Sequence, residues 1–187
     1  VARSRLCCTG TPFNSTVTAE GQSTVLYEGT SSTRAVEGMG YKPDLLWIKG
    51  RDNTAHALSH HLLDRVRGPS NWIASDRTQA AEDYGDRVQS FKSDGFTLGS
   101  DSSNAVNDSG DRYVAWAWDA GADQTPTGFG CVAYTGSGTR RPVRDVGFTP
   151  DLVWVKARED TYHHMLADSV RGANKYLSSS QTAAEGT

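Results

Sequence analysis

Short runs in which apolar and polar residues alternate recur along the chain, separated by clusters of turn-forming residues. The clearest run, residues 45–51, follows a Gly-x-x-Pro-Asp turn and alternates with the period of two that is typical of a β-strand. One face carries Trp47, Lys49 and Arg51, and the other face carries Leu46 and Ile48. Similar runs predict strands at residues 60–66, 88–91, 96–98 and 113–118. Only residues 75–83 are compatible with a helical turn, so the pattern predicts an all-β fold.

The run at residues 113–118 has two unlike faces. One face carries Val114, Trp116 and Trp118, and the other carries Ala115 and Ala117. Short strands joined by polar turns such as Asp94-Gly95 are typical of an antiparallel β-sandwich, and we expect a jelly-roll or lectin-like arrangement.

The same pattern occurs twice. When Tyr27 is aligned with Tyr134, identical and conservatively exchanged residues lie 107 positions apart for 25 residues without a gap. The next loop is three residues shorter in the second copy, and the match then resumes 104 positions apart from His60 and His164 onward. A match of this length indicates a tandem repeat.

The repeat divides the chain into four segments. We expect an N-terminal arm (residues 1–22), a first β-sandwich repeat (23–121), a linker (122–128) and a partial second repeat (129–187). The second copy has no counterpart of residues 88–118. Because a sheet without these strands would leave open edges and an uncovered apolar face, we expect further polypeptide or a neighbouring subunit to complete it.

Composition and charge exclude some function classes. The chain has 19 Lys and Arg against 22 Asp and Glu, a net charge of −3, and no basic cluster, so we expect no nucleic-acid partner. It has no run of about 18 apolar residues, so we expect no membrane insertion. Cys7, Cys8 and Cys131 have neither the number nor the spacing of a disulfide framework or a zinc site, and we expect reduced thiols.

One candidate for acid–base chemistry recurs in both copies. His60 and Asp64 are repeated as His164 and Asp168. Residues four apart on a strand lie about 13 Å apart, which is too far for direct proton transfer. We therefore expect no catalytic residues, and interpret the pair as structural, with Asp64 holding the turn at Arg67.

Two features are candidate metal ligands. The histidine doublets 60–61 and 163–164 cannot chelate one ion on a regular strand, because adjacent side chains point to opposite faces. One loop contains many oxygen donors: Asp101, Asn104, Asn107, Asp108 and Asp111. Calcium binds such loops, but the spacing is not that of an EF-hand, so we favour a solvated turn and expect no metal or cofactor.

The aromatic residues have two interpretations. Trp47 and Trp154 occupy the same place in each copy between aliphatic neighbours, which favours a core role over a sugar-stacking platform. Trp72, Tyr84 and Tyr176 lie nearer to predicted loops and are better candidates for ligand contact. The expected structural residues of the repeat are Trp47, Trp154, His60, His164, Asp64, Asp168, Arg67 and Arg171.

Four segments together carry a resemblance to a known family. They are Gly-Tyr-Lys-Pro-Asp-Leu-Leu-Trp-Ile-Lys (40–49), His-x-Leu-x-Asp-x-Val-Arg-Gly (60–68), Ser-Phe-Lys-Ser-Asp-Gly-Phe-Thr-Leu-Gly (90–99) and Tyr-Val-Ala-Trp-Ala-Trp (113–118). In combination they resemble a repeat module of tailed-phage virion proteins, which is common in cyanobacterial phages and is usually described as a tail-fibre or structural protein. The resemblance implies a virion component exposed on the tail or head, and implies no catalytic residues.

From this resemblance we expect a phage virion structural protein: a tail-fibre, spike or head-decoration module that takes part in host-surface attachment. The implied partners are other virion proteins, copies of the same chain in a homo-oligomer, and a host-surface glycan. Presentation in many copies would strengthen weak individual contacts. The implied location is the virion surface, after assembly in the host cytoplasm. The alternatives are a carbohydrate-binding lectin-type module and, less favoured because no pair of carboxylates stands out, a glycan-cleaving enzyme.

Overall fold

A computed structural model describes residues 16–19, 21–52, 58–121 and 128–187 of the chain. These residues form twelve β-strands and contain no helix, and therefore none long and apolar enough to cross a membrane. The strands are β1 (Thr16–Ala19), β2 (Gln22–Glu28), β3 (Arg34–Glu37), β4 (Leu45–Gly50), β5 (His61–Asp64), β6 (Gly68–Ile73), β7 (Glu82–Asp83), β8 (Val88–Lys92), β9 (Gly95–Leu98), β10 (Arg112–Trp118), β11 (Leu152–Val155) and β12 (Met165–Asp168).

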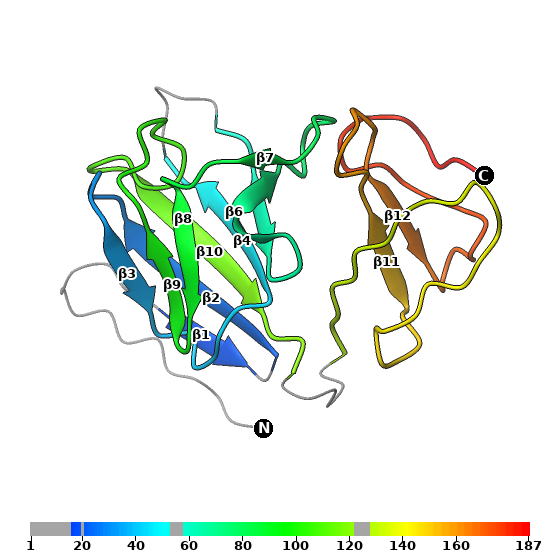
Figure 1. Ribbon diagram of the computed structural model, residues 1–187, viewed down its shortest axis with the longest axis horizontal. Coiled ribbons are helices and arrows are strands. Elements are labelled where there is room, and N and C mark those ends of the chain that lie inside the picture. Colours follow the sequence, from blue (N-terminus) through cyan, green and yellow to red (C-terminus); the bar gives the residue numbers. More distant parts are fainter. Residues whose placement is uncertain (1–15, 20, 53–57, 122–127) are drawn as a thin grey trace.

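The first repeat is built from two antiparallel sheets that pack face to face (Figure 1). One sheet has seven strands in the order β1-β2-β10-β4-β5-β6-β7, and the other has three in the order β3-β9-β8. Rings from both sheets meet between them: the Tyr27 ring stacks on Tyr113 at 5.1 Å and meets the edge of Phe96 at 6.0 Å. The prediction of an all-β, antiparallel, sandwich-like fold is confirmed.

The core between the two sheets follows the period-two pattern. It is filled from the seven-stranded sheet by Val25, Tyr27, Leu46, Ile48, Tyr113, Ala115 and Ala117, and from the other side by Val36, Val88, Phe96 and Leu98. All of these side chains are almost fully buried. Burial of this continuous apolar surface is the main source of the stability of the first repeat.

The tryptophans of β4 and β10 lie on the opposite, outer face of the seven-stranded sheet. Trp47 and Trp116 are paired across the two strands, and their rings are 5.5 Å apart. Both side chains are half-buried and neither belongs to the core between the sheets. This differs from the core position expected for Trp47. Both faces of residues 45–51 carry apolar side chains, so the alternation alone does not indicate which face the second sheet covers.

Two segments differ from the sequence-based expectations. Residues 16–19, within the expected arm, form β1, which pairs with β2 at the edge of the large sheet. Residues 75–83, the one segment compatible with a helical turn, form a turn followed by β7, which pairs with β6. The position of β7 is set by pairing with the preceding strand, and such pairing overrides a weak helical preference.

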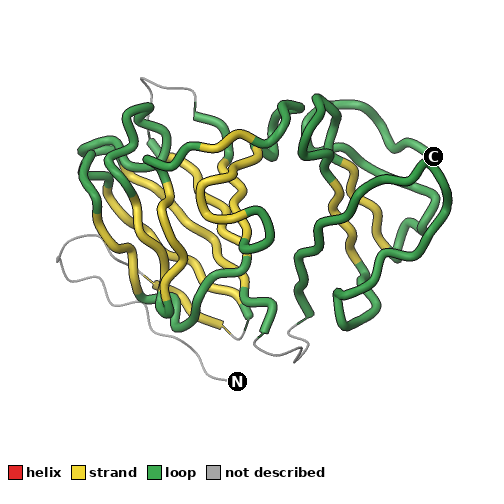
Figure 2. Tube along the Cα trace, viewed as in Figure 1, coloured by secondary structure: helices red, strands yellow, loops and turns green. Residues whose placement is uncertain are grey.

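The second repeat reproduces one part of the first. Strands β11 and β12 form an antiparallel pair in which Leu152 lies opposite Asp168, as Leu45 lies opposite Asp64 between β4 and β5. The register is the same at all four positions of both pairs. The bridge Leu166–Leu177 likewise corresponds to the pairing of Leu62 with Ile73. The predicted equivalence of the two copies in this region is therefore confirmed, and Figure 2 shows that loops make up most of the rest of the second copy.

Candidate functional site

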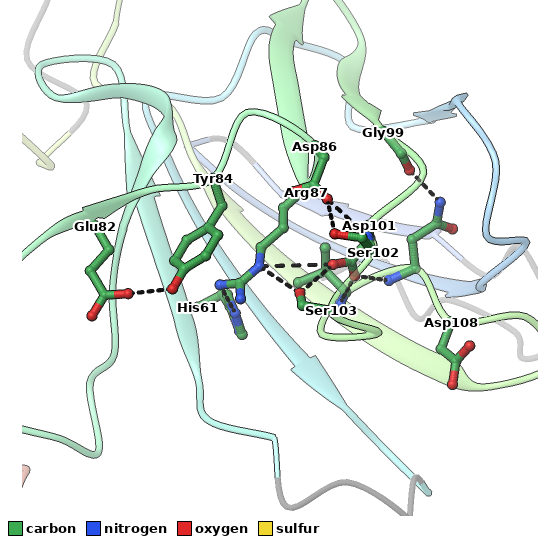
Figure 3. Close-up of polar contacts among 12 residues, drawn as sticks. His61, Glu82, Tyr84, Asp86, Arg87, Gly99, Asp101, Ser102, Ser103 and Asp108 are labelled. Carbon is green, nitrogen blue, oxygen red and sulfur yellow. Dashed lines mark hydrogen bonds and ion pairs between the residues drawn. The ribbon is translucent and has the colours of Figure 1, made fainter.

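Arg87 is the centre of a buried polar cluster inside the first repeat (Figure 3). We call the group His61, Trp72, Tyr84, Arg87, Asp101 and Ser103 the Arg87 cluster. It is held by the end of the large sheet, by the turn before β8 and by the loop between β9 and β10. The cluster combines a cation, a carboxylate, an imidazole and two aromatic rings. This variety of functional groups makes it the candidate functional site of the first repeat.

The guanidinium of Arg87 lies against aromatic rings on one side and polar groups on the other. Its Cζ atom is 3.7 Å from the centre of the Tyr84 ring and 5.1 Å from that of Trp72. Its Nη1 lies 3.2 Å from Nε2 of His61, and its Nε donates to the Ser103 hydroxyl at 3.0 Å. These contacts stabilise a buried cation by π-electron density and by hydrogen bonds.

Asp101 supplies the negative charge of the cluster and organises the loop after β9. One carboxylate oxygen accepts the Ser103 hydroxyl at 2.7 Å and lies 3.8 Å from Arg87 Nε. The other accepts the backbone N–H groups of Val106 and Asn107 at 2.5 and 2.9 Å. Asp101 is 1% exposed, so its charge is balanced by these donors and not by water.

His61 is neutral at ordinary pH. Burial, with a further contribution from the Arg87 charge, lowers the pKa of His61 to about 4. Because Arg87 can only donate, His61 Nε2 is the acceptor and the Nδ1–H group donates to the Ser59 carbonyl at 3.0 Å. The ring stacks on Trp72 at 4.5 Å. His61 therefore acts as a neutral acceptor for a buried cation.

The residues expected to contact a ligand occupy different environments. Trp72 is buried under His61 and Arg87, and its indole nitrogen has no hydrogen-bond partner in the described part of the chain. Tyr84 is half-buried and its hydroxyl donates to the Glu82 carboxylate at 2.5 Å. Tyr176, the counterpart of Trp72, is half-buried and bridges to Gly186. Of the three, Tyr84 and Tyr176 are accessible and Trp72 is not.

The repeated aspartates and arginines form a turn clamp in each copy. Asp64 accepts the backbone N–H of Arg67 at 2.9 Å and its Nε at 2.6 Å, and Arg67 Nη2 donates to the Leu62 carbonyl at 3.1 Å. Asp168 and Arg171 make the same two contacts at 2.9 and 2.6 Å. The expected role of Asp64 in holding this turn agrees with this geometry, in which the carboxylate is engaged by its own arginine.

The repeated histidines pair with the repeated tryptophans. The indole N–H of Trp47 donates to His60 Nδ1 at 2.8 Å, and that of Trp154 donates to His164 Nδ1 at 2.8 Å. Since Nδ1 is the acceptor, each imidazole is neutral and carries its proton on Nε2. Burial lowers the pKa of both His60 and His164. In these contacts the histidines serve as hydrogen-bond acceptors.

The histidine doublets do not converge on one point. His60 lies against Trp47 on the outer face, whereas His61 is buried in the Arg87 cluster. In the second copy, His164 is buried and the neighbouring His163 is exposed, with Nδ1 3.0 Å from the Ser180 hydroxyl. Across the described residues, no group of three or more His, Cys, Asp or Glu side chains is placed to hold a metal ion.

The oxygen-rich loop is used for internal hydrogen bonding. Besides the two N–H groups held by Asp101, the Asn107 side chain donates to the carbonyls of Ser32 and Gly99 and accepts the N–H of Thr30. The Asp101 carboxylate and the Asn107 side-chain oxygen, both calcium-type ligands, are thus committed to N–H groups in this structure.

The second repeat packs against the outer face of the first. The Trp154 ring lies 5.8 Å from Trp47, and Phe129 stacks on Trp118 at 6.2 Å. His164 Nε2 lies 2.9 Å from the Ala74 carbonyl, and the Ser179 hydroxyl donates to the carbonyl of Ser75 at 2.8 Å. Figure 1 shows β11 and β12 beside the large sheet on the side of β4. Trp47 and Trp118, on the outer face of the large sheet, thus lie at the contact between the copies.

Cys131 lies near this contact. Burial raises the pKa of its thiol to about 12, with the Asp64 carboxylate as the largest electrostatic contribution. A thiol with such a pKa stays protonated and is a weak nucleophile. Cys7 and Cys8 lie outside the described residues.

Arg87 was not among the residues predicted from the sequence to have a role, whereas Asp101 was predicted as an oxygen donor. Arg87 has no counterpart in the second copy, so the repeat gave no signal for it. Ser75 and Ser179 were visible as an identical pair 104 positions apart. Their direct contact could be known only from the structure.

The chain belongs to a family of domains whose function is unknown. A profile of the family described as a domain of unknown function (DUF7483) matches it twice, at residues 19–130 and 125–187. This agrees with the tandem repeat found in the sequence. No curated protein and no solved structure gives a match.

Proposed function

We propose that this chain is a structural module of a phage virion protein, exposed as part of a tail fibre, spike or head decoration. The observation that carries the proposal is that the most distinctive repeated residues hold the module together or join one copy to the next. The Asp–Arg pairs clamp turns in both copies, and the Trp–His pairs lie at the contact between the copies. Residues with such roles suit a protein that builds an extended assembly.

The same observation supports a non-enzymatic role. The histidine and carboxylate of the repeated motif have separate partners, because His60 accepts from Trp47 while Asp64 is paired with Arg67. An acid–base mechanism requires a base within hydrogen-bond reach of its nucleophile or orienting group. The assignment to a virion rests on the resemblance of the sequence motifs, which implies a location on the particle surface. The jelly-roll arrangement expected from the strand pattern and presentation in many copies are parts of the same proposal.

Localisation on particles tests the proposal directly. An antibody raised against residues 16–187 is applied to purified particles of the phage that encodes the chain, with gold labelling and electron microscopy. We expect gold at a regular position on the tail or head, and the peptides of the chain in the mass spectrum of the purified particles. A chain found in infected cells but absent from particles would contradict the proposal.

Carbohydrate binding is the second candidate function, and one observation favours it. Tyr84 is an accessible aromatic side chain whose hydroxyl is bonded to the Glu82 carboxylate, a combination that can stack on and hydrogen-bond to a sugar. A glycan array with the whole chain tests this, and Tyr84→Ala should remove the signal. The matched control is Tyr162→Ala, which removes an exposed tyrosine of the second copy. Binding that survives Tyr84→Ala would exclude this site, and turnover of host polysaccharide would favour an enzyme.

A further inference from the structure

The contact between the two copies brings equivalent residues together. Trp47 and Trp154 are equivalent in the repeat, and their rings are in contact at 5.8 Å. Ser75 and Ser179 are also equivalent, and the hydroxyl of one donates to the carbonyl of the other at 2.8 Å. In a head-to-tail arrangement, a residue meets a different residue of the next copy. Equivalent residues meet each other where a rotation axis that relates the two copies passes close to them, and a twofold axis is the case in which the contact is self-complementary.

The surroundings of these two contacts repeat on both sides of the axis. Each tryptophan donates to its own histidine at 2.8 Å, with ring separations of 5.4 Å for Trp47–His60 and 5.6 Å for Trp154–His164. The backbone N–H of each histidine also donates to an equivalent partner in the turn after the strand pair, at 3.1 and 3.3 Å. These partners are Asp76 Oδ1 for His60 and Ser180 Oγ for His164.

The symmetry is approximate at its margins. His164 is buried and reaches the Ala74 carbonyl of the first copy, whereas His60 is half-buried. The N–H of Ala81 donates to the Arg158 carbonyl at 2.7 Å and adds a backbone contact on one side. The centre of the contact still pairs equivalent residues, Trp47 with Trp154 and Ser75 with Ser179, although only the Ser179 hydroxyl donates across it.

We propose that this surface is a self-complementary pairing face, whose partner is the same face of another copy of the module. The pairing face consists of Trp47, His60 and Ser75 in the first copy, and of Trp154, His164 and Ser179 in the second. A twofold contact presents the same patch from both sides, so any copy that carries the patch fits any other. In this chain, the pairing face of each copy is covered by the pairing face of the other copy. A first repeat that lacks the second repeat would instead pair with the same face of a second molecule.

The first repeat alone is a suitable object for the test. Residues 16–121 include ten of the twelve strands, both packed sheets and every member of the buried core cluster. The three cysteines of the chain lie outside this range, so an introduced cysteine is the only thiol. The fragment therefore keeps its own core and exposes the pairing face.

The first experiment measures the mass of this fragment by sedimentation equilibrium. We expect a dimer, and a monomer with unchanged circular dichroism for Trp47→Ala. Thr97→Ala, on the three-stranded sheet away from the face, is the control and should remain dimeric. A folded fragment that is monomeric would overturn the inference. An unfolded fragment would also overturn it, because the face must be carried by a module that keeps its fold without its neighbour.

The second experiment locates the axis. In the fragment, Ser75→Cys should cross-link to its own copy under mild oxidation, because equivalent residues meet there, whereas Ser93→Cys in the β8–β9 turn should not. In the whole chain with the native cysteines replaced by alanine, the pair Ser75→Cys and Ser179→Cys should form an intramolecular disulfide. The pair Ser93→Cys and Ser179→Cys is the control. A folded protein that fails to form the 75–179 disulfide would show the proposed axis to be wrong.

Discussion

The two copies have the same strand register but differ in the burial of equivalent residues. Leu46 in β4 is 0% exposed, whereas its counterpart Val153 in β11 is 42% exposed. Val36 in β3 is also fully buried, and its counterpart Val143 is 45% exposed and lies in a loop. The local sequence is therefore sufficient for the hairpin, while burial depends on strands from elsewhere.

The three-stranded sheet that covers the inner face of β4 in the first copy explains this difference. In the first copy, β3 pairs with β9, and the sheet β3-β9-β8 covers the inner face of β4. In the second copy, the described residues correspond to the first copy as far as Asp83, so strands equivalent to β8, β9 and β10 are not among them. A strand whose partner is distant in sequence forms only when that partner is present, which accounts for the loop at the counterpart of β3.

The sharpest test of this comparison is to truncate the same core position in both copies. Leu46→Ala removes a fully buried side chain, and we expect it to lower the free energy of unfolding by about 2–5 kcal/mol. Val153→Ala removes an exposed side chain and should change it by less than about 0.5 kcal/mol. Urea unfolding followed by tryptophan fluorescence measures both. Equal losses for the two variants would mean that the inner face of the second copy is covered as well as that of the first.

Acid should destabilise the first copy through a histidine that the second copy lacks. His61 has a folded-state pKa of about 4, below its ordinary value, so the unfolded chain takes up the proton first as the pH falls. The contribution of neutral His61 to the free energy of unfolding is complete above about pH 6.5. This contribution falls by about 3 kcal/mol as the pH is lowered to about 4.

The measurement is the free energy of unfolding between pH 7 and 4.5. The counterpart of His61 is Met165, so His61→Met gives the first copy the residue of the second. This variant should have a shallower dependence on pH, whatever its stability at neutral pH. The remaining slope would come from His60 and His164, whose pKa values are also lowered by burial. An unchanged slope would contradict the role assigned to His61.

The turn clamps allow a smaller test. Asp64→Asn leaves the Arg67 guanidinium without its carboxylate in a site where both side chains are mostly buried, and should cost about 1–3 kcal/mol. Asp168→Asn breaks the same contact in a more exposed site, so we expect a smaller loss because water replaces the carboxylate. Thermal unfolding of the two variants measures the difference. A larger loss for Asp168→Asn would reverse the proposed order of burial.

The smallest expected effect concerns the indole hydrogen bonds. Trp47→Phe and Trp154→Phe each keep an aromatic ring at the pairing face and remove the N–H that donates to a histidine. Each should cost about 0.5–1.5 kcal/mol, and the two costs should be similar because the bonds are equivalent. Thermal unfolding of both variants is the measurement. A marked inequality would indicate that the two bonds do not contribute equally.

Much of the fold could be predicted from the sequence because it depends on local pattern and on repetition. The alternation at residues 45–51 predicted β4, and the repeat placed β11 correctly. The Asp64–Arg67 clamp was also predictable, since its partners lie three residues apart in a turn. The Arg87 cluster was not, because His61, Arg87 and Asp101 meet only when the two sheets pack.

The sequence by itself determined the all-β class, the tandem repeat and the residues of the turn clamps. These features follow from short-range geometry, in which side chains alternate between faces and a turn brings near neighbours together. Only the tertiary structure decided which face of β4 is core and which face carries Trp47 to the second copy. Both faces are apolar enough to be buried, so the choice was made by what each face meets: a second sheet on one side and an equivalent module on the other.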